Sequence, residues 1–450
     1  MTGLERIRAV MRGEACDSIP WLPFAGIHAG KLCGFSAREV LTDFDKLMKS
    51  LLEVNRLYRP DGQPVMFDLQ IEAEILGCEL LWSENAPPTV VSHPLAETDD
   101  IPAVIPSADD GRLALAVAAA AELKSRVGGH TAVYALLTGP FTLASHLRGT
   151  NIFMDMIMNP AYVESLLSYA ADVCIAVSSY YIDAGADVVA VVDPLVSQIS
   201  SAHFDEFMNA PFRRLFDSIR KRGVFTSFFV CGNATANIEP MCRTAPDSIS
   251  VDENVDLAAA KRITDEYEIV IGGNIPLTSV MLFGSQLDNM KQTIDLIDSL
   301  DNTDRLIIAP GCDMPYDIPV ENTIGVEQAV HQSAQVREMV GNYESAEIEF
   351  EGELPDYAAL SRPLIEVFTL DSASCAACTY MMASASDVKD YFGDSVDLIE
   401  YKYTVPQNIA RCREMKVMQL PSIYINGELK YSSIIPDRDA FIDEVRKCLS

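Results

Sequence analysis

The feature that most constrains the fold is a series of short apolar runs, each rich in Val, Ile or Phe and each ended by a polar residue, Gly or Pro. Segments with helical spacing separate most of the runs, and this alternation is typical of βα units around a parallel sheet. The runs predict an α/β fold, a (β/α)8 TIM barrel, with a doubly wound open sheet as the alternative. The predicted strands are residues 21–26, 64–69, 132–139, 187–193, 224–230, 247–252, 268–273 and 305–311.

One intervening segment illustrates the predicted helices. Ser36 and Glu39 have the spacing of a capping box, which satisfies two backbone N–H groups at a helix start. Apolar residues then recur on one face of a helix that extends to about Val54. The sequence therefore predicts a single amphipathic helix here.

The character of the sequence changes after Asn342. Residues 344–362 are acidic, lack apolar periodicity and contain no basic residue before Arg362, so we expect a linker. The barrel is accordingly predicted over residues 1–343 and a second, small domain over residues 363–450. The expected order of elements in that second domain is strand, helix, strand, helix, hairpin and helix.

The charge balance argues against two classes of partner. The chain has 34 Lys and Arg against 65 Asp and Glu, a formal net charge of −31. Nucleic acids and anionic membranes are bound by clustered basic residues, so neither is expected as a partner. The N-terminus lacks the apolar core of a signal peptide and no long apolar run is evident, so we expect a cytoplasmic protein. Its 11 cysteines are then expected to be reduced, metal-bound, catalytic or buried.

Polar residues occur at the predicted C-terminal ends of the strands, where TIM barrels carry their chemistry. Cys231 and Cys312 are far apart in sequence, but a closed barrel would bring them to one mouth. Two thiolates, one nitrogen or oxygen ligand and an open position make a zinc site of the catalytic type. Burial as small apolar side chains is the alternative, and the sequence leaves open whether the pair binds metal, stays free or forms a disulfide. The candidates at the mouth are His28, Asp68, Asp193, Cys231, Asp252, Asn274 and Cys312.

The aspartates at the strand ends allow two interpretations. Asp68, which Glu72 follows closely, is placed to orient a cation, ligate a metal or accept a proton. Asp193 and Asn274 are predicted to contribute to a cofactor-binding site. An aspartate before a helix also serves as its N-cap, and this role fits Asp193 and Asp252 about as well.

Several segments carry a family resemblance. They include "LERIRAVMRGEACDSIPWLP", "FDLQIEAEILGCEL", "LLTGPFTLASHLRG", "VCGNATANIEPM" and "IIAPGCDMPYDIPVENTIGVEQAV". Together they resemble the uroporphyrinogen decarboxylase superfamily over about residues 1 to 340, which implies the TIM barrel.

The decarboxylase branch of that superfamily has an Arg-Gln-Ala-Gly-Arg stretch after the first strand and an aspartate after the second. Asp68 falls on the aspartate position, but "FAGIHAG" replaces the arginine stretch. Because those arginines bind the propionates of the tetrapyrrole, uroporphyrinogen is not the expected substrate.

The corrinoid-dependent methyltransferase branch uses zinc to activate a thiol towards a methylated corrinoid protein. The resemblance implies a His-x-Cys pair after the fifth strand and a cysteine in "APGC" after the eighth. Cys231 and Cys312 match the two cysteines, whereas Phe229 stands at the histidine position. His28 is the first choice to replace that histidine, because imidazole is a common metal ligand.

The C-terminal segment resembles small thioredoxin-like domains. Cys375 and Cys378 form a CxxC motif after the first strand of the segment, and "LPSIYINGEL" places Pro421 where that family has a cis-proline facing the dithiol. Cys375 is then the expected attacking thiol and Cys378 the resolving one. A zinc knuckle is the alternative, but it needs a second pair of cysteines, which Cys412 and Cys448 do not form.

These observations lead to one main functional hypothesis and two alternatives. The main one is a methyltransferase that moves a methyl group between a corrinoid protein and a thiol or other small methylated substrate, with zinc on Cys231 and Cys312. The first alternative is a decarboxylase that relies on Asp68. The second is a non-catalytic corrinoid-binding or redox-delivery module.

Overall fold

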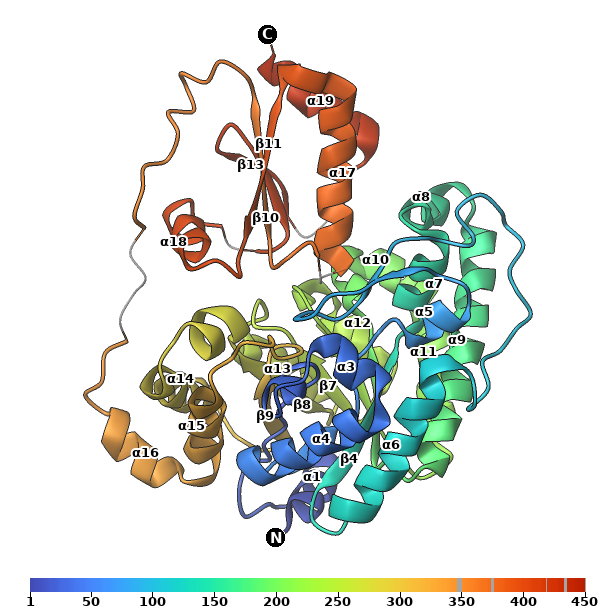
Figure 1. The fold of residues 1–450 in the computed structure, drawn as a ribbon, viewed down its shortest axis with the longest axis vertical. Coiled ribbons are helices and arrows are strands. Elements are labelled where there is room, and N and C mark those ends of the chain that lie inside the picture. Colours follow the sequence, from blue (N-terminus) through green and yellow to red (C-terminus); the bar gives the residue numbers. More distant parts are fainter. Residues whose placement is uncertain (346–349, 374–375, 418, 433–434, 450) are drawn as a thin grey trace. The chain divides into compact units, whose positions relative to one another are not determined.

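The computed structural model describes all residues except 346–349, 374–375, 418, 433–434 and 450 (Figure 1). The chain divides into two compact units, the first comprising Met1–Val196 and Ser200–Glu344, and the second Ser345–Ser450 with Ser197–Ile199. Each unit has a sheet of its own.

The first unit is built on a parallel, TIM-barrel-like sheet. In the described residues its strand order is β1-β4-β5-β6-β7-β8-β9, so consecutive βα units lie side by side. Except at the first two predicted strands, the bounds agree with the sequence prediction within two residues. The strands are β1 (Gly62–Pro64), β4 (Ala132–Thr138), β5 (Val188–Val192), β6 (Phe225–Val230), β7 (Ser248–Val251), β8 (Val270–Ile275) and β9 (Leu306–Pro310), with a separate hairpin of β2 (Leu80–Leu81) and β3 (Thr89–Val90).

The predicted strand at residues 21–26 is reduced to a single bridge. Trp21 pairs in parallel with Ile308, and Leu22 N–H donates to the Ile308 carbonyl at 2.9 Å. On the other side, Asp61 N–H donates to the Trp21 carbonyl at 2.9 Å. This segment therefore lies between β9 and β1, the place of the eighth strand. Pro23 interrupts any longer ladder because it has no N–H to donate.

Helices pack around the outside of the sheet (Figure 1). The α-helices of the first unit are α1 (Gly3–Met11), α2 (His28–Lys31), α3 (Ala37–Thr42), α4 (Phe44–Tyr58), α5 (Ile71–Ile75), α6 (Gly111–Val127), α7 (Pro140–Arg148), α8 (Asn151–Met158), α9 (Pro160–Asp183), α10 (Ser201–His203), α11 (Asn209–Arg220), α12 (Ile238–Arg243), α13 (Leu257–Glu266), α14 (Gln286–Asp298), α15 (Val320–His331) and α16 (Ser333–Val340). Short 3-10 or π turns are η1 (Pro194–Gln198), η2 (Phe204–Met208), η3 (Thr235–Asn237) and η4 (Leu277–Leu282).

The helix predicted to start after Ser36 is two helices. The capping box is present, with Glu39 N–H donating to Ser36 Oγ at 3.3 Å and Ser36 N–H donating to Glu39 Oε2 at 2.9 Å. The first helix stops at Asp43, which is extended and accepts from Lys46 N–H at 3.0 Å. A second N-cap inside the predicted helix thus breaks it into α3 and α4.

The second unit contains a four-stranded sheet in the order β11-β10-β12-β13. β10 and β11 are parallel, whereas β12 is antiparallel to both β10 and β13. The elements follow the order that the sequence predicts. They are β10 (Leu364–Thr369), α17 (Ala376–Phe392), η5 (Gly393–Ser395), β11 (Asp397–Lys402), α18 (Pro406–Glu414), β12 (Ser422–Ile425), β13 (Glu428–Ser432) and α19 (Arg438–Cys448).

Candidate functional site

Cys231 and Cys312 meet at the C-terminal end of the barrel sheet. Cys231 directly follows β6, and Cys312 comes shortly after β9. Because β7 and β8 lie between these strands, the two loops reach across the ends of both. The sulfur atoms form a disulfide with a Cα–Cα distance of 5.8 Å. The convergence of the two cysteines, predicted from their positions at strand ends, is confirmed.

An apolar cluster of aromatic side chains contacts the disulfide. The Phe24 and Phe229 ring centroids are 4.6 Å apart, and Phe67 lies 5.8 Å from Phe229. Both cysteines pack against the buried cluster that contains these rings. Phe229, at the position where the resemblance implies a histidine ligand, is thus part of the barrel core. We call these three rings the aromatic floor.

His28 makes contacts that compete with metal binding. Its Nδ1 is 3.0 Å from the Tyr316 carbonyl oxygen, and its Nε2 is 2.7 Å from the Tyr58 hydroxyl. Burial lowers the pKa of His28 to about 4, so the imidazole is neutral. Because both ring nitrogens are engaged, the prediction that His28 completes a zinc site gains no support.

The side chains present do not fit a zinc site with three protein ligands. Among the residues that the structure describes, no three His, Cys, Asp or Glu side chains are grouped to hold a metal ion. Cys231 and Cys312 supply two sulfur ligands, while Phe229 is apolar and His28 is hydrogen-bonded elsewhere. Catalytic zinc sites normally use three protein ligands and one open position.

Carboxylates hold the loops that carry the two cysteines. The Asp252 side chain accepts from the backbone N–H of Gly232, which follows the first cysteine. Asp313, which follows the second, accepts from Gly26 N–H at 2.9 Å. Burial raises the pKa of Asp252 and raises that of Asp313 well above its usual range. A buried carboxyl group therefore anchors the residue that follows each cysteine. Asp252 binds the backbone of Gly232, and Asp313 binds the backbone of Gly26.

Glu253 adds a third carboxyl group to this edge of the sheet. Its side chain accepts from the Leu277 backbone N–H. A Cβ atom on Gly311 would come within 3.3 Å of Glu253 Cβ, so Glu253 lies directly against the loop after β9. Burial, together with the neighbouring Asp252, raises the pKa of Glu253. Burial therefore raises the pKa of all three carboxyl groups at this edge, and it raises the pKa of Glu253 to about 8.

Comparison with known proteins places this barrel in a family. The family model described as uroporphyrinogen decarboxylase (URO-D) matches residues 2–333. The chain belongs to the uroporphyrinogen decarboxylase family. A solved structure described as a methyltransferase from Methanosarcina mazei superposes with a TM-score of 0.67 at 22% identity, covering 74% of this chain and 99% of that one, which shows the shared fold.

Curated relatives within the family include two kinds of enzyme. The methylcobamide:CoM methyltransferase MtbA of Methanosarcina mazei is 28% identical over 294 residues, which are 64% of this chain and 86% of that protein. Its counterpart in Methanosarcina acetivorans is 26% identical over 329 residues, 71% of this chain and 95% of that protein. A uroporphyrinogen decarboxylase of Nostoc punctiforme is 26% identical over 250 residues, 54% of this chain and 70% of that protein.

Asp68, the aspartate shared with the decarboxylases by resemblance, is paired with a cation in this family member. Its buried side chain forms an ion pair with Arg112, which also binds Glu74 at 2.7 Å. The Arg112 guanidinium in turn lies 4.9 Å from the centre of the Trp82 ring. Nearby, Thr138 Oγ donates to Glu72 at 3.1 Å, and burial raises the pKa of Glu72 to about 7.

Asp193 and Asn274 make structural contacts. The Asp193 carboxylate accepts from the N–H groups of Phe141 and Thr142 at 2.9 and 3.0 Å and from Thr142 Oγ at 2.6 Å. It therefore caps α7, not the turn that follows it in sequence. Asn274 Nδ2 donates to the carbonyls of Asp252 and Val255 at 2.9 and 2.7 Å. The prediction that Asp193 and Asn274 bind a cofactor gains no support from these contacts.

Sequence reasoning missed Arg112, Glu253 and Asp313. Asp313 directly follows the "APGC" segment and Glu253 directly follows Asp252, so both could have been found by their position next to a strand end. Arg112 begins a helix far from Asp68 in sequence, and no local pattern links the two residues.

In the second unit, Cys375 of the CxxC motif lies outside the described residues. Cys378 is buried and accepts from Leu370 N–H at 3.3 Å. The Leu420–Pro421 peptide is cis, as expected for a proline at this position. The roles of Cys375, Cys378 and Pro421 in redox chemistry stay predictions.

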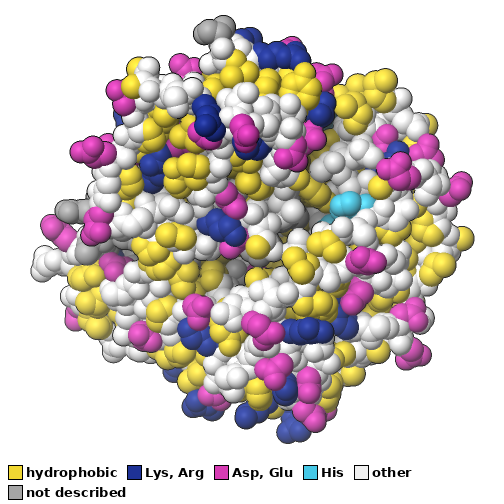
Figure 2. All heavy atoms as spheres, turned by 45° about the horizontal axis from the view of Figure 1, so that its top comes forward, with side chains coloured by type: hydrophobic (Ala, Val, Ile, Leu, Met, Phe, Trp, Pro, Cys, Tyr) yellow, Lys and Arg dark blue, Asp and Glu magenta, His cyan; other side chains and the backbone are white. Residues whose placement is uncertain are grey.

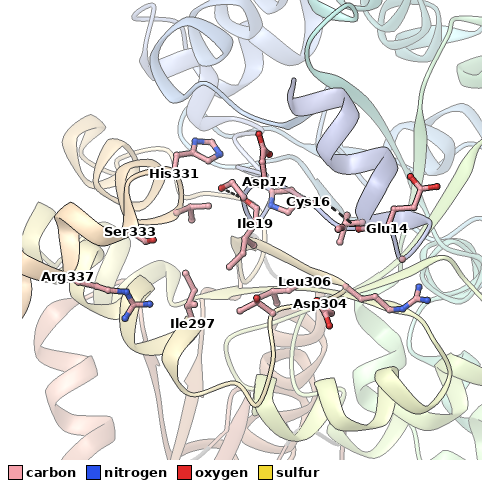
Figure 3. A pocket seen from close by; sticks show the side chains of 18 residues that line it. Glu14, Cys16, Asp17, Ile19, Ile297, Asp304, Leu306, His331, Ser333 and Arg337 are labelled. Atoms are coloured by element: carbon pink, nitrogen blue, oxygen red, sulfur yellow. Dashed lines mark hydrogen bonds between the residues drawn. The ribbon is translucent and has the colours of Figure 1, made fainter. Parts of the chain in front are cut away.

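A cavity of about 630 Å³ lies at the opposite end of the first unit, among segments that precede the strands (Figure 3). Asp17 and Asp304 line it ahead of Trp21 and β9, and His331 lines it from α15. In TIM barrels this N-terminal face contributes stability, while chemistry is at the other face. The cavity is therefore not the candidate site.

The exposed surface carries charges of both signs. On the face shown in Figure 2, acidic side chains are interspersed with Lys and Arg.

Among the described helices, α9 is long and apolar enough to cross a membrane by length and composition, although the sequence predicted no such run. Because 61% of its apolar window is buried inside the protein, α9 is better explained as a core helix.

Proposed function

We propose that the protein is a corrinoid-linked methyltransferase that moves a methyl group between a corrinoid protein and a thiol or another small methylated substrate. The observation that carries this proposal is the convergence of Cys231 and Cys312 at the mouth of a uroporphyrinogen decarboxylase-family barrel. The similarity to methylcobamide:CoM methyltransferases supports it. The corrinoid enters as a substrate carried by a partner protein.

The charges at the mouth favour methyl transfer over decarboxylation of a polycarboxylate. Asp252, Glu253 and Asp313 are held by backbone N–H groups and offer no positive charge to the carboxylates of uroporphyrinogen. Arg112 is already neutralised by Asp68 and is therefore a poor site for a propionate. An apolar aromatic floor instead suits a methyl group, because it excludes water from the reacting atoms.

The residues of the mouth have two tasks in this proposal. An acceptor thiol must lose its proton before its sulfur can take a methyl group, and a carboxyl group with a raised pKa is suited to exchange that proton near neutral pH. Glu253, next to the loop of Cys312, is our candidate. The two cysteines in their reduced form provide sulfur atoms beside the aromatic floor. No step is assigned to zinc, because its third ligand is missing.

For the second unit we propose a thioredoxin-like domain in which Cys375 attacks, Cys378 resolves and Pro421 faces the dithiol. The element order, the cis-proline and the buried Cys378 support this assignment. Cytosolic disulfides are usually transient and catalytic, so a redox dithiol is compatible with the cytoplasmic location that we propose.

Methyl transfer from methylcobalamin to a panel of small thiols tests the proposal. Protein reduced beforehand should convert methylcobalamin to a demethylated corrinoid and yield a methyl thioether, measured by absorbance and mass spectrometry. Cys231→Ser and Cys312→Ser should each reduce the rate at least about tenfold, which corresponds to 1.4 kcal/mol. The matched control is Cys33→Ser, because Cys33 is also partly buried but is not disulfide-bonded.

Two results would contradict the proposal, and a third would change the account of the site. Product formation that needs Asp68 but neither cysteine would favour the decarboxylase alternative. Stabilisation by a corrin without transfer would favour the non-catalytic module. One zinc per chain, lost in both cysteine variants, would restore the metal-based version of the site and require a different third ligand.

A further inference from the structure

The loop that carries Cys312 is held by backbone contacts on both sides of the cysteine. Gly311 N–H donates to the Ile275 carbonyl at 3.1 Å, and Met314 N–H donates to the Phe24 carbonyl at 2.9 Å. These bonds tie the loop to β8 and to the segment between β9 and β1. They do not involve the sulfur atom, so they persist whether or not the disulfide is formed.

The loop that carries Cys231 is held in the same way. Asp193 N–H donates to the Phe229 carbonyl at 2.8 Å, and the Asp252 side chain accepts from Gly232 N–H. The backbone on both sides of the disulfide is therefore fixed by the barrel. Opening the S–S bond leaves the two sulfur atoms adjacent, which is what a reversible dithiol requires.

The two cysteines also differ in exposure from other cysteines of the unit. Cys231 and Cys312 are both partly exposed, with the aromatic floor on one side. In contrast, Cys78, Cys174 and Cys242 in the same unit are buried. Partial exposure to solvent distinguishes a reactive cysteine pair from buried, structural cysteines.

Among the described residues no third protein ligand for a metal is grouped with the pair, whereas its two sulfur atoms are bonded to each other in a partly exposed disulfide. We propose that Cys231 and Cys312 form a thiol–disulfide exchange centre whose co-substrate is a vicinal dithiol. One thiolate of that dithiol attacks one sulfur of the disulfide, which gives a mixed disulfide and releases the other cysteine. The second thiol of the dithiol resolves the mixed disulfide. The cysteine pair gains two electrons and two protons, and the dithiol becomes a disulfide.

The exchange centre is an activity in addition to the proposed methyl transfer. Its effect on methyl transfer, described next, rests on the proposed function. In the disulfide form both sulfur atoms are bonded to each other and the cross-link reaches across the ends of β7 and β8. Reduction by a dithiol would therefore convert the mouth into its methyl-transfer form.

A redox titration of the full-length protein tests the proposal. Protein purified without reductant is equilibrated with graded ratios of reduced to oxidised dithiothreitol, quenched in acid and alkylated, and peptides are quantified by mass spectrometry. Zinc is measured in the same samples. We expect the peptides of Cys231 and Cys312 to gain label together, with a first-order dependence on the dithiol-to-disulfide ratio. Cys33→Ser should leave this titration unchanged.

The single variant Cys231→Ser provides an internal test, because Cys312 should then be labelled fully without reductant. Circular dichroism of the double variant Cys231→Ala/Cys312→Ala checks that the fold survives loss of both sulfurs. Full labelling of both cysteines before reduction would overturn the proposal. So would one zinc per chain that protects both sulfurs from label and is lost in either single variant.

Methyl transfer measured on the same fractions separates this proposal from the proposed function. A two-electron titration without transfer in any fraction supports the exchange centre and rejects the methyltransferase. Transfer at every ratio without a titration rejects the exchange centre alone. The source of the dithiol is identified with Cys375→Ser/Cys378→Ser. Slower reduction of the mouth pair in that variant assigns the dithiol to the chain's own CxxC, and unchanged reduction assigns it to a separate molecule.

Discussion

The two ends of the barrel use charged residues in opposite ways. At the N-terminal end, buried Asp61 accepts hydrogen bonds from Arg6 at 2.9 Å, from Trp21 N–H at 2.7 Å and from His331 at 2.9 Å. His331 also contacts Glu327 at 3.0 Å. Burial alone would lower the pKa of His331, but these two carboxylates outweigh burial and raise it to about 9. Every charge in this network has an opposite partner.

At the C-terminal end, Asp68 is paired with Arg112, but three other buried carboxyl groups form no ion pair with any described residue. Asp252, Glu253 and Asp313 are held by backbone N–H groups, and burial raises the pKa of each. Paired charges stabilise one structure, whereas buried carboxyl groups with raised pKa values can exchange protons near neutral pH. The difference indicates that stability is concentrated at one end and chemistry at the other. Each of the following experiments probes one end.

The largest effect is expected from Asp61→Asn. This variant leaves Arg6 and protonated His331 without their shared buried carboxylate, so the free energy of unfolding should fall by about 3–5 kcal/mol. Both tryptophans, Trp21 and Trp82, lie in the first unit, so urea denaturation followed by tryptophan fluorescence reports this unit. The control is Asp17→Asn, an exposed partner of Arg6, with an expected loss of about 1 kcal/mol or less. Equal losses in the two variants would contradict the prediction.

A smaller effect is expected from opening the disulfide at the mouth. It closes a loop with a sequence separation of 81, so reduction should lower the unfolding free energy of the first unit by about 2–4 kcal/mol. Urea midpoints with and without reductant measure this difference. The double variant Cys231→Ala/Cys312→Ala should not respond to reductant. A midpoint that is the same in both states of the parent would show that the pair does not form the cross-link.

The pH dependence of stability should reveal Glu72. Its pKa is raised by burial from 4.5 to about 7, so its contribution is fully present below pH 4.5 and is lost as the pH rises through 7. Glu72→Gln keeps an acceptor for Thr138 and removes the ionisation. At pH 8 the variant should be more stable than the parent by about 2–3 kcal/mol, with little difference at pH 4. Exposed Glu164→Gln is the control, and a difference independent of pH would contradict the assignment.

The smallest effect is expected from Ser36→Ala. It removes the side-chain acceptor of the α3 capping box, which should cost about 1 kcal/mol. Ser36→Gly should cost only a few tenths, because glycine leaves the backbone open to water. Urea denaturation of the three proteins measures the series. Two equal losses would indicate that Ser36 acts through packing.

Local and periodic features of the sequence predicted most of the fold. The buried runs at β4 to β9 are mostly apolar and end at clear signals, so their bounds were predicted closely. The first strand was overestimated because a proline interrupts its ladder, and the helix after Ser36 was not divided because Asp43 looked like an ordinary helix residue. Pro23 and Asp43 act through the backbone, whereas the prediction of a strand over residues 64–69 was wrong because β1 spans only Gly62–Pro64.

The candidate site was predicted in outline only. The cysteines converge because topology brings strand ends together, and topology is visible in the sequence. The engagement of His28 by Tyr58 and of Asp68 by Arg112 depends on side chains that meet only in the folded barrel. The roles predicted for His28 as a metal ligand and for Asp68 as a catalytic residue depend on these contacts, which no pattern in the sequence shows.

The apolar helix α9 has a consequence for how the chain is made. It is long and apolar enough to resemble a membrane span, and in the folded protein it packs against α7 and α11. α11 follows α9 in the sequence, so during synthesis α9 leaves the ribosome before the element that covers it. Until α11 has emerged, the nascent chain presents an uncovered apolar helix, a substrate for chaperones that bind exposed hydrophobic segments.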